Sequence, residues 1–455
     1  MRHYQPDSVV HMVRDAIVGR CRHIAPRTFL MVAAAVTGLV TGVTAYLLKK
    51  MIVFVSKSVI GIIHPDGFSL WFVLLALCGI ILSAVFQRYV VRDYVEDGCS
   101  RIIMRDLRER KYYLKKRDMI AAFMASSITL GFGGSAGAEG PIAFTGGAIG
   151  SNLGRFAGAR KSDVRLLIGI GAGAGAGIAG IFQAPLGGML FTLEIMAMPM
   201  TTWAVMALAL GCVTSAMTSA SLAGFRIDFP VGSFPDFSLG LLPAVFLLGL
   251  FCGLYSVYYN TTGNITAGLI ARVRTWWGRA VVSGLMLGVC VSMVPMLYGE
   301  GYSAMGRLMS GDYGVLGINS VFSDMGTSPS LILLAGVVLL LKGIAKASAT
   351  RGGGVGGDFA PTLFAGCVAG FFFAQVSDAL LGVRLPPVEM AFVGMTGVMA
   401  GAVRAPLMAA FLVAEMSGTY SIFFPIIIVA AVSYATARIA ERVIRNVKSC
   451  AERAR

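Results

Sequence analysis

The sequence predicts an all-α polytopic membrane protein in which many helices are broken or tilted. The chain of 455 residues is 56% hydrophobic and 13% charged, with a mean hydropathy of +0.76, whereas a soluble protein needs more polar surface to face water. Runs of roughly 18 or more nearly uncharged residues recur, and each is long enough to cross a hydrocarbon core of about 30 Å. Glycine and proline interrupt the apolar segments, which predicts the broken helices.

The apolar segments give the predicted order of the membrane helices. These are residues 29–62, 70–92, 119–133, 140–155, 162–180, 185–198, 201–224, 240–272, 281–298, 329–349, 359–381, 387–402, 404–417 and 421–441. Several are too short to span, and such helices persist at membrane depth only where protein or a watery cavity satisfies the freed backbone groups. In transporters that geometry marks the binding site. Residues 225–239 and 299–328 are predicted to be connections outside the membrane.

The net charge of +15 is placed as expected for a membrane protein rather than for a nucleic-acid partner. Basic residues gather before the first apolar run, between Arg88 and Arg117, and after the last run. This positive-inside pattern predicts cytoplasmic termini, a cytoplasmic N-terminal segment at 1–27 and a short cytoplasmic tail at 441–455 without a regulatory domain. Such an organisation suits a bacterial inner membrane, and the same charge favours contact with anionic lipid. Eight scattered cysteines without a CxxC pair indicate neither a disulfide framework nor a metal site.

An internal repeat divides the predicted membrane region. The segment Gly180–Glu194 matches Gly401–Glu415, with Pro185 falling on Pro406 at an offset of 406 − 185 = 221. Further upstream, Pro141 falls on Pro361 at an offset of 361 − 141 = 220. The two landmarks predict a first repeat at 28–225 and a second at 226–440, although chance similarity between Gly/Ala/Pro-rich segments is the alternative. The spacing alone does not distinguish parallel from inverted repeats.

The densest motif is GGSAGAEGP, at residues 133–141, between two apolar segments. Glycines let backbone approach a ligand closely, and Pro141 suits the first turn of a helix. A helix N-terminus aimed into the membrane attracts anions through its partial positive charge and its free N–H groups. The carboxylate of Glu139 would compete with an anion for these donors, and protonation would release it. A helix-capping glutamate in a surface loop is the structural alternative.

A second glycine-rich motif, GGGVGGDFAP at residues 352–361, lies at the equivalent place in the second repeat. Two such helix starts that converge would hold one dehydrated anion with dipoles rather than full charges, which allows its release. A flexible glycine-rich loop is the alternative. Lys342 and Lys346 lie four residues apart on one helical face, as expected of interfacial residues that snorkel or serve at a cytoplasmic mouth.

At these residues the chain resembles the CLC family of voltage-gated chloride channels and chloride/proton exchangers. Residues 137–141 match its GxEGP motif and residues 357–361 match its GxFxP motif. The resemblance implies two inverted-topology repeats, a homodimer with a pore in each protomer, chloride and similar anions as substrates, no cofactor and no enzymatic activity. It further implies that Glu139 gates the pore and carries protons. The predicted anion-binding residues are Gly137, Ala138, Gly140, Cys99, Ser100, Gly357, Asp358, Phe359 and Ala360.

Three departures from the family pattern bear on the mechanism. Cys99 falls where the family supplies a serine hydroxyl to the anion, unless the register slips by one to Ser100. Ile195 stands where exchangers carry an internal proton-relay glutamate, and the final segment lacks the tyrosine that contacts the anion. The departures slightly favour channel-like or weakly proton-coupled conduction with looser anion selectivity. A chloride/proton antiporter is the alternative.

Two other classes of membrane protein share part of this pattern. An intramembrane aspartyl protease uses a GxGD motif, to which residues 355–358 come close, but position 355 is valine and no second mid-segment aspartate completes the pair. A cation-coupled carrier of an organic acid would use the same broken helices with a larger pocket, and nothing in the sequence demands one. Both are therefore disfavoured.

Overall fold

The computed structural model describes residues 26–60, 70–91, 114, 116–156, 164–198, 200–225, 239–317, 328–418 and 420–453. All regular elements in these ranges are helices, apart from one isolated bridge between Gly137 and Gly357. The chain divides into two compact units. Unit 1 comprises 1–47, 100–122 and 142–225, and unit 2 comprises 48–99, 123–141 and 226–455. The predicted division into repeats at 225/226 concerns sequence order and remains a prediction.

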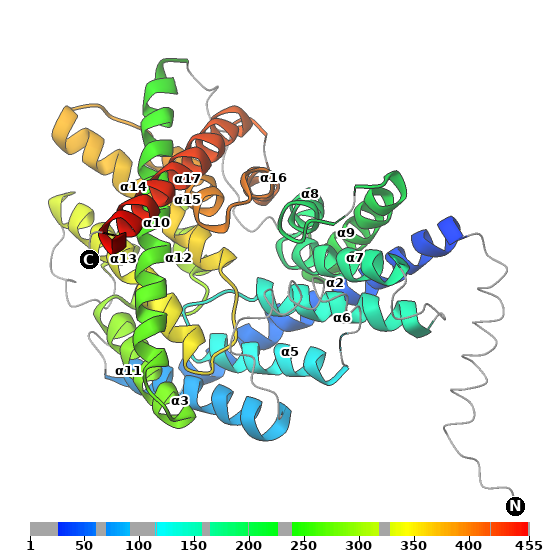
Figure 1. The fold of residues 1–455 in the computed structure, drawn as a ribbon. Helices are drawn as coiled ribbons and strands as arrows, with labels where there is room; N and C mark the ends of the chain where they lie inside the picture. Colours follow the sequence, from blue (N-terminus) through cyan, green and yellow to red (C-terminus); the bar gives the residue numbers. More distant parts are fainter. Residues whose placement is uncertain are drawn as a thin grey trace, which may run out of the picture. The chain divides into compact units, whose positions relative to one another are not determined.

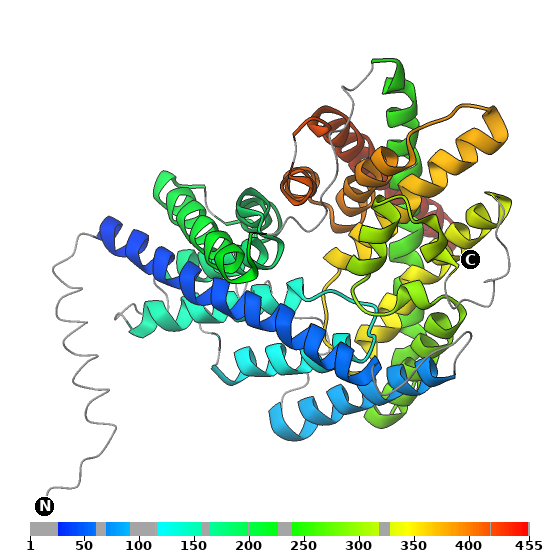
Figure 2. The ribbon, with the colours of Figure 1, turned by 180° about the vertical axis from the view of Figure 1, so that it is seen from behind.

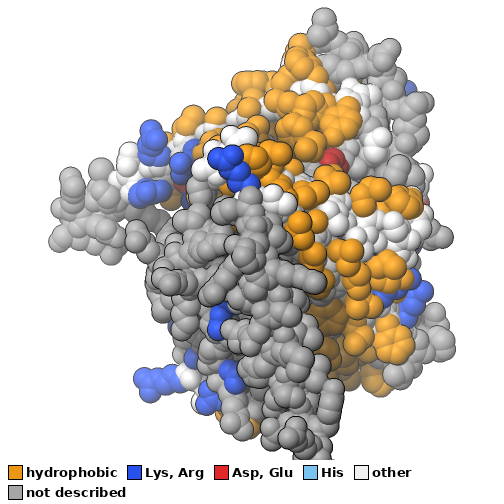
Figure 3. Space-filling view, turned by 90° about the vertical axis from the view of Figure 1, so that its right-hand side faces the viewer, with side chains coloured by type: hydrophobic (Ala, Val, Ile, Leu, Met, Phe, Trp, Pro, Cys, Tyr) orange, Lys and Arg blue, Asp and Glu red, His pale blue; other side chains and the backbone are white. Residues whose placement is uncertain are grey.

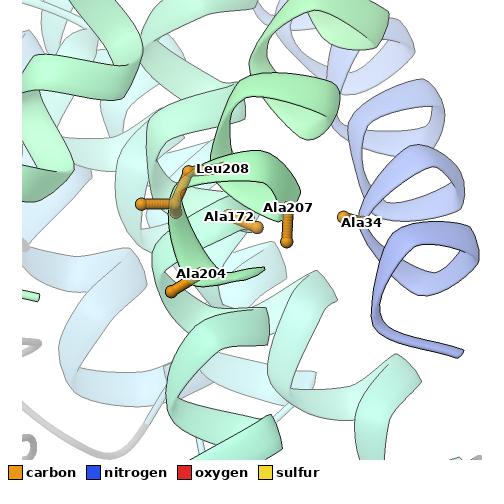
Figure 4. Packing of buried hydrophobic residues seen from close by; sticks show 5 residues of the cluster. All are labelled: Ala34, Ala172, Ala204, Ala207 and Leu208. Carbon is orange, nitrogen blue, oxygen red and sulfur yellow. The ribbon is translucent and has the colours of Figure 1, made fainter. Parts of the chain in front are cut away.

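Unit 1 is built largely from helices rich in glycine and alanine. They are α2 (Pro26–Ile60, shared with unit 2), α6 (Glu139–Phe156, whose first three residues belong to unit 2), α7 (Val164–Phe182), α8 (Pro185–Leu190) followed by the π-helical turn η2 (Phe191–Ile195), and α9 (Thr202–Ala223). Helices α7 and α9 pack along each other (Figure 1). Figure 4 shows their small residues in contact with Ala34 of α2: the cluster is Ala34, Ala172, Ala204, Ala207 and Leu208. Small side chains bring the backbones close, which is how membrane helices pack without a hydrophobic driving force.

Unit 2 holds the remaining helices. They are α3 (Trp71–Val85) with η1 (Phe86–Val91), α5 (Lys116–Gly131, whose first residues belong to unit 1), η3 (Leu239–Leu241), α10 (Leu242–Ala271), α11 (Trp276–Met293), η4 (Pro295–Leu297), α12 (Tyr302–Met309), η5 (Tyr313–Leu316), α13 (Ser328–Arg351), α14 (Phe359–Leu381), α15 (Pro387–Val403), α16 (Pro406–Ser417) and α17 (Phe423–Arg453). Helix α10 packs against α13, α15 and α17, and α14 packs against α15 (Figures 1 and 2). Helix α14 is therefore enclosed, with Phe359 to Phe371 buried.

Eight of the described helices are long and apolar enough to cross a membrane, and five shorter apolar helices accompany them. Hydrophobic side chains cover much of the described part of the face in Figure 3, as expected of a surface that meets lipid. The predicted helices are confirmed to within a few residues at most ends. Two differences stand out: the predicted connection at 299–328 contains α12, and α17 continues to Arg453 rather than ending at 441.

The repeat is visible in the helix boundaries. Helices α5 and α13 end at 131 and 351, and α7 and α15 end at 182 and 403. Helices α6 and α14 begin at 139 and 359, and α8 and α16 begin at 185 and 406, so at these four boundaries beside the breaks the offset is 220 or 221. The helices that follow the two glycine-rich motifs are thus equivalent elements, as the internal repeat predicts.

Candidate functional site

Two equivalent glycine-rich loops in unit 2 lead into helices α6 and α14. The first follows the end of α5 at Gly131, and the second follows the end of α13 at Arg351. Each loop turns at a glycine with a positive φ, 94° at Gly133 and 108° at Gly353. A side chain is strained in this conformation, so glycine is required at both turns. The two turns are again 353 − 133 = 220 residues apart.

A reciprocal pair of backbone hydrogen bonds joins the two loops. The Gly137 N–H donates to the Gly357 carbonyl over 3.1 Å, and the Gly357 N–H donates to the Gly137 carbonyl over 2.6 Å. Exchange of both bonds is the pattern of an antiparallel pair. Because 357 − 137 = 220, each glycine bonds to its own equivalent in the other repeat. A local two-fold axis therefore passes between them, as expected of inverted repeats.

A threonine on α5 ties the second loop to α3. The Thr129 hydroxyl accepts a hydrogen bond from the Val355 N–H at 3.0 Å and lies 3.0 Å from the Ser83 hydroxyl. Ser83 in turn donates to the carbonyl of Gly353 over 2.8 Å. All of these groups are buried, where an unpaired backbone amide or carbonyl would be costly. The network therefore holds the second loop against α5 and α3.

Glu139 begins α6 and is only 1% exposed. Its Oε1 accepts a hydrogen bond from the Ala360 N–H in the first turn of α14, at 3.0 Å, and another from the Tyr302 hydroxyl, at 3.0 Å. Its Oε2 is buried and has no hydrogen-bond partner among the described residues. The carboxylate of the first motif is thus bound to a helix N-terminus of the second motif, through a donor that an anion would also use.

Two glycines make room for this carboxylate. A Cβ atom at Gly137 would lie 1.8 Å from Glu139 Oε2, and one at Gly357 would lie 3.1 Å from the same oxygen. Any side chain at position 137 would therefore displace the carboxylate. The backbone thus approaches the Glu139 carboxylate closely at both positions. Close approach to an anion, which the sequence predicts for these glycines, stays a prediction.

Two further residues contact the site from the segment 299–328, which the sequence predicts to be a connection outside the membrane. Tyr302 begins α12 and donates to Glu139 as described above. Glu300, two residues earlier, accepts a hydrogen bond from the Ala138 N–H through Oε1 at 3.0 Å. Glu300 lies in the sequence Gly-Glu-Gly-Tyr, beside an apolar segment. This resembles the acidic residue next to glycine in the first motif, and it is the sequence signal that could have identified Glu300 as a candidate site residue.

The prediction that Lys342 lies at a membrane interface is wrong. The side chain is 0% exposed, and its ammonium donates to the Ser135 hydroxyl at 2.9 Å and lies 4.3 Å from the centre of the Phe364 ring. No carboxylate of the described residues lies within ion-pair distance of it. Its neighbour Lys346 forms an ion pair with Asp358.

The other predicted site residues have different placements. Gly137, Ala138, Gly140, Phe359 and Ala360 are buried around Glu139, whereas Gly357 is half-buried. The Asp358 side chain is exposed and directed to Lys346, so only its backbone is available to the site. Cys99 and Ser100 lie outside the described residues. Ile195 ends η2 in unit 1 and is half-buried.

Comparisons with known proteins agree with this arrangement. The family model described as voltage gated chloride channel matches residues 78–438. A protein of Ralstonia nicotianae, the putative chloride channel protein ClcB-like, is 29% identical over 364 residues, which cover 77% of this chain and 77% of that protein. The similarity therefore spans both repeats and both glycine-rich loops.

Solved structures share the fold. A slow cyanobacterial Cl−/H+ antiporter superimposes with a TM-score of 0.75 and 24% identity, covering 95% of this chain and 100% of that one. A CLC-type fluoride/proton antiporter gives a TM-score of 0.70 with 20% identity over 90% and 94% of the two chains. A eukaryotic CLC transporter gives 0.69 with 16% identity over 95% and 72%. With its paired glycine loops, its buried glutamate and a family match over most of its length, the chain belongs to the voltage-gated chloride channel (CLC) family.

Proposed function

We propose that this CLC-family anion transporter exchanges chloride for protons, with Glu139 as both the gate and the proton carrier. The observation that carries the proposal is the hydrogen bond from the Ala360 N–H to Glu139 Oε1. A carboxylate bound to this donor and a chloride bound to the same donor exclude each other. Protonation weakens the acceptor, so uptake of a proton by Glu139 and entry of an anion favour each other.

The site would hold the anion with backbone amides rather than with fixed charges. The proposed donors are the N–H groups of Ala138 and Gly140 beside the start of α6, and those of residues 358–360 at the start of α14. The Gly137 and Gly357 amides, which the sequence predicts as anion donors, are instead bonded to each other's carbonyls. Dipolar donors bind a dehydrated halide without holding it too tightly for release. The hydroxyl or thiol that Ser100 or Cys99 would add remains a prediction.

Antiport is better supported than the channel-like conduction that the sequence slightly favoured. The Glu139 carboxylate is buried in the proposed anion path, and one of its oxygens has no partner among the described residues. A charged group in that position is unstable unless it leaves or takes a proton, which couples each anion movement to a proton. Two of the solved structures with this fold are named as proton antiporters. Ile195 carries no proton, so another group must complete the relay in its part of the path.

The oligomeric state, the membrane and the orientation of the termini are proposed from the family resemblance and the charge pattern. We propose a homodimer with one pore per protomer, residing in a bacterial inner membrane with both termini on the cytoplasmic side. An aspartyl protease is disfavoured because Asp358 is exposed and forms an ion pair with Lys346.

The test is transport by purified protein in liposomes, with chloride and pH electrodes recording together. An antiporter is expected to drive protons uphill on a chloride gradient at a fixed ratio. Glu139→Gln keeps an oxygen acceptor at the site but cannot be ionised, so chloride flux should become independent of pH and proton movement should cease.

Each alternative function predicts a different flux result in this assay. Chloride flux that depends on pH in the wild type, without uphill proton movement, would support the channel-like function instead. Competition by organic acids at millimolar concentration would indicate the carrier class. A Glu139→Gln protein that transports and titrates like the wild type would remove Glu139 from the mechanism.

A further inference from the structure

Glu300 is attached to the first motif in nearly the same way as Glu139 is attached to the second. Its Oε1 accepts the Ala138 N–H at 3.0 Å, and that amide belongs to the residue directly before Glu139. The loop that bears Glu300 is bonded to the same motif at its base, because the Gly299 N–H donates to the Gly133 carbonyl at 3.2 Å. The position of the Glu300 carboxylate is therefore fixed by the motif itself.

The two carboxylates also differ in their access to water. Glu139 is 1% exposed, whereas Glu300 is partly exposed. Tyr302, two residues after Glu300, donates its hydroxyl to Glu139 Oε1 at 3.0 Å. One short segment of chain thus carries a partly exposed carboxyl and a hydroxyl in contact with the buried one. A proton that arrives from water meets Glu300 before it meets Glu139.

The charged and titratable groups around the pair are few in the described part of the chain. The Lys49 ammonium of α2 lies 6.0 Å from the centre of the Tyr302 ring, and the Tyr298 hydroxyl donates to the Gly131 carbonyl. Lys342 is directed to Ser135 instead. The buried Tyr259 hydroxyl also interacts electrostatically with Glu139, and Asp358 pairs with Lys346. Glu300 is the carboxylate that repels ionised Glu139, and two neighbouring carboxylates in a poorly solvated site tend to hold one proton between them.

We propose that Glu300 is a second titratable residue of the transport path, which takes protons from water on its side of the membrane and passes them to Glu139. The transfer leaves Glu300 ionised and Glu139 neutral, and water then reprotonates Glu300. The ionised Glu300 also occupies the Ala138 amide, one of the proposed anion donors. The inference rests on the proposed function, because it assumes that Glu139 gates the path.

The first test is Glu300→Gln, whose amide oxygen still accepts the Ala138 N–H. Loss of the neighbouring negative charge makes ionised Glu139 more stable, so Glu139 takes a proton only at lower pH. The pH of half-maximal chloride flux is expected to fall by about one unit, which is about a tenfold loss of flux on the alkaline side of the midpoint. The matched control is Asp312→Asn, which removes an exposed carboxylate that pairs with Arg307 just beyond α12.

The outcomes separate this inference from the proposed function. A Glu300→Gln protein with the midpoint of the wild type, or with the same shift as Asp312→Asn, overturns the role of Glu300 while leaving that of Glu139 intact. A Glu139→Gln protein that still drives protons uphill on a chloride gradient overturns the proposed function itself.

A second measurement does not depend on the folding of a variant. Proton uptake on addition of chloride to the purified wild type should follow a titration curve broadened over two interacting groups. A curve that fits one independent carboxyl would refute the pair.

Discussion

Replacing Tyr302 by phenylalanine removes one of the two hydrogen bonds that hold the Glu139 carboxylate. The other donor, the Ala360 N–H, and the volume of the ring are kept. The hydroxyl stabilises the ionised carboxylate far more than the protonated one, because a charged acceptor forms the stronger bond. If Glu139 gates the path as proposed, the change acts on the balance between its closed, ionised form and its open, protonated form.

The size of the effect follows from that single bond. A hydrogen bond to a charged group contributes about 1.5 to 3 kcal/mol, and a pH unit corresponds to about 1.4 kcal/mol. Without the bond, Glu139 takes up a proton at higher pH. The pH of half-maximal chloride flux is therefore expected to rise by about one to two units. This direction is opposite to that expected for Glu300→Gln.

The assay is chloride efflux from liposomes over a series of pH values. Tyr298→Phe is the matched control, because its hydroxyl donates at 3.0 Å to the carbonyl of Gly131 rather than to Glu139. It should lower thermal stability and leave the midpoint of flux in place. A Tyr302→Phe midpoint that is unchanged, or that moves to lower pH, would refute the assigned role of this hydroxyl.

Further predictions concern stability and are checked by thermal unfolding of purified protein in detergent. Tyr255→Phe should cost about 0.5 to 1.5 kcal/mol because it removes the side-chain donor to the Leu339 carbonyl, whereas Tyr259→Phe should cost less, since that hydroxyl has no hydrogen-bond partner among the described residues. Thr129→Val should cost about 1 to 3 kcal/mol by leaving an amide of the second loop unpaired, and Thr129→Ser should recover most of it. Gly146→Ala places a Cβ atom 2.1 Å from a carbonyl oxygen of α7 and should lower the stability by about 1 to 3 kcal/mol. In Gly306→Ala the added Cβ atom meets nothing within 4 Å, so this variant should be more stable by about 0.5 to 1 kcal/mol. Equal melting temperatures of the two variants in any of these pairs would contradict the prediction for that pair.

The long helices could be predicted from sequence because their signals are local. Helix α14 is predicted and found at 359–381: a proline lies in its first turn, and Gly382 ends it with a φ of 66°. The two glycine motifs were equally accessible, since each combines turn residues, a helix start and the repeat offset within ten residues. Because the two motifs lie at equivalent places in the two repeats, the sequence also predicts that the two helix starts converge.

The rest of the site depends on contacts between distant segments. Helix α12 has eight residues, too few to give a periodic signal that separates it from a loop, and Tyr302 reaches Glu139 across 163 positions of sequence. Lys342 has the spacing of an interfacial residue, but α13 places it between Ser135 and Phe364, which lie far away in the chain. A lysine with no acidic neighbour in sequence gives no sign of such burial.

The bond between Gly137 and its own counterpart Gly357 also bears on how this chain arose. Two separate, identical half-length polypeptides would form the same contact across the axis that relates them, so an ancestral dimer of such halves would already have possessed the junction. Its symmetry would have imposed one residue type on positions 139 and 359. A single chain is free of that constraint, and this one has glutamate at position 139 and phenylalanine at position 359. An acidic side chain at only one of two equivalent helix starts is therefore available to the single chain and not to a dimer of identical halves.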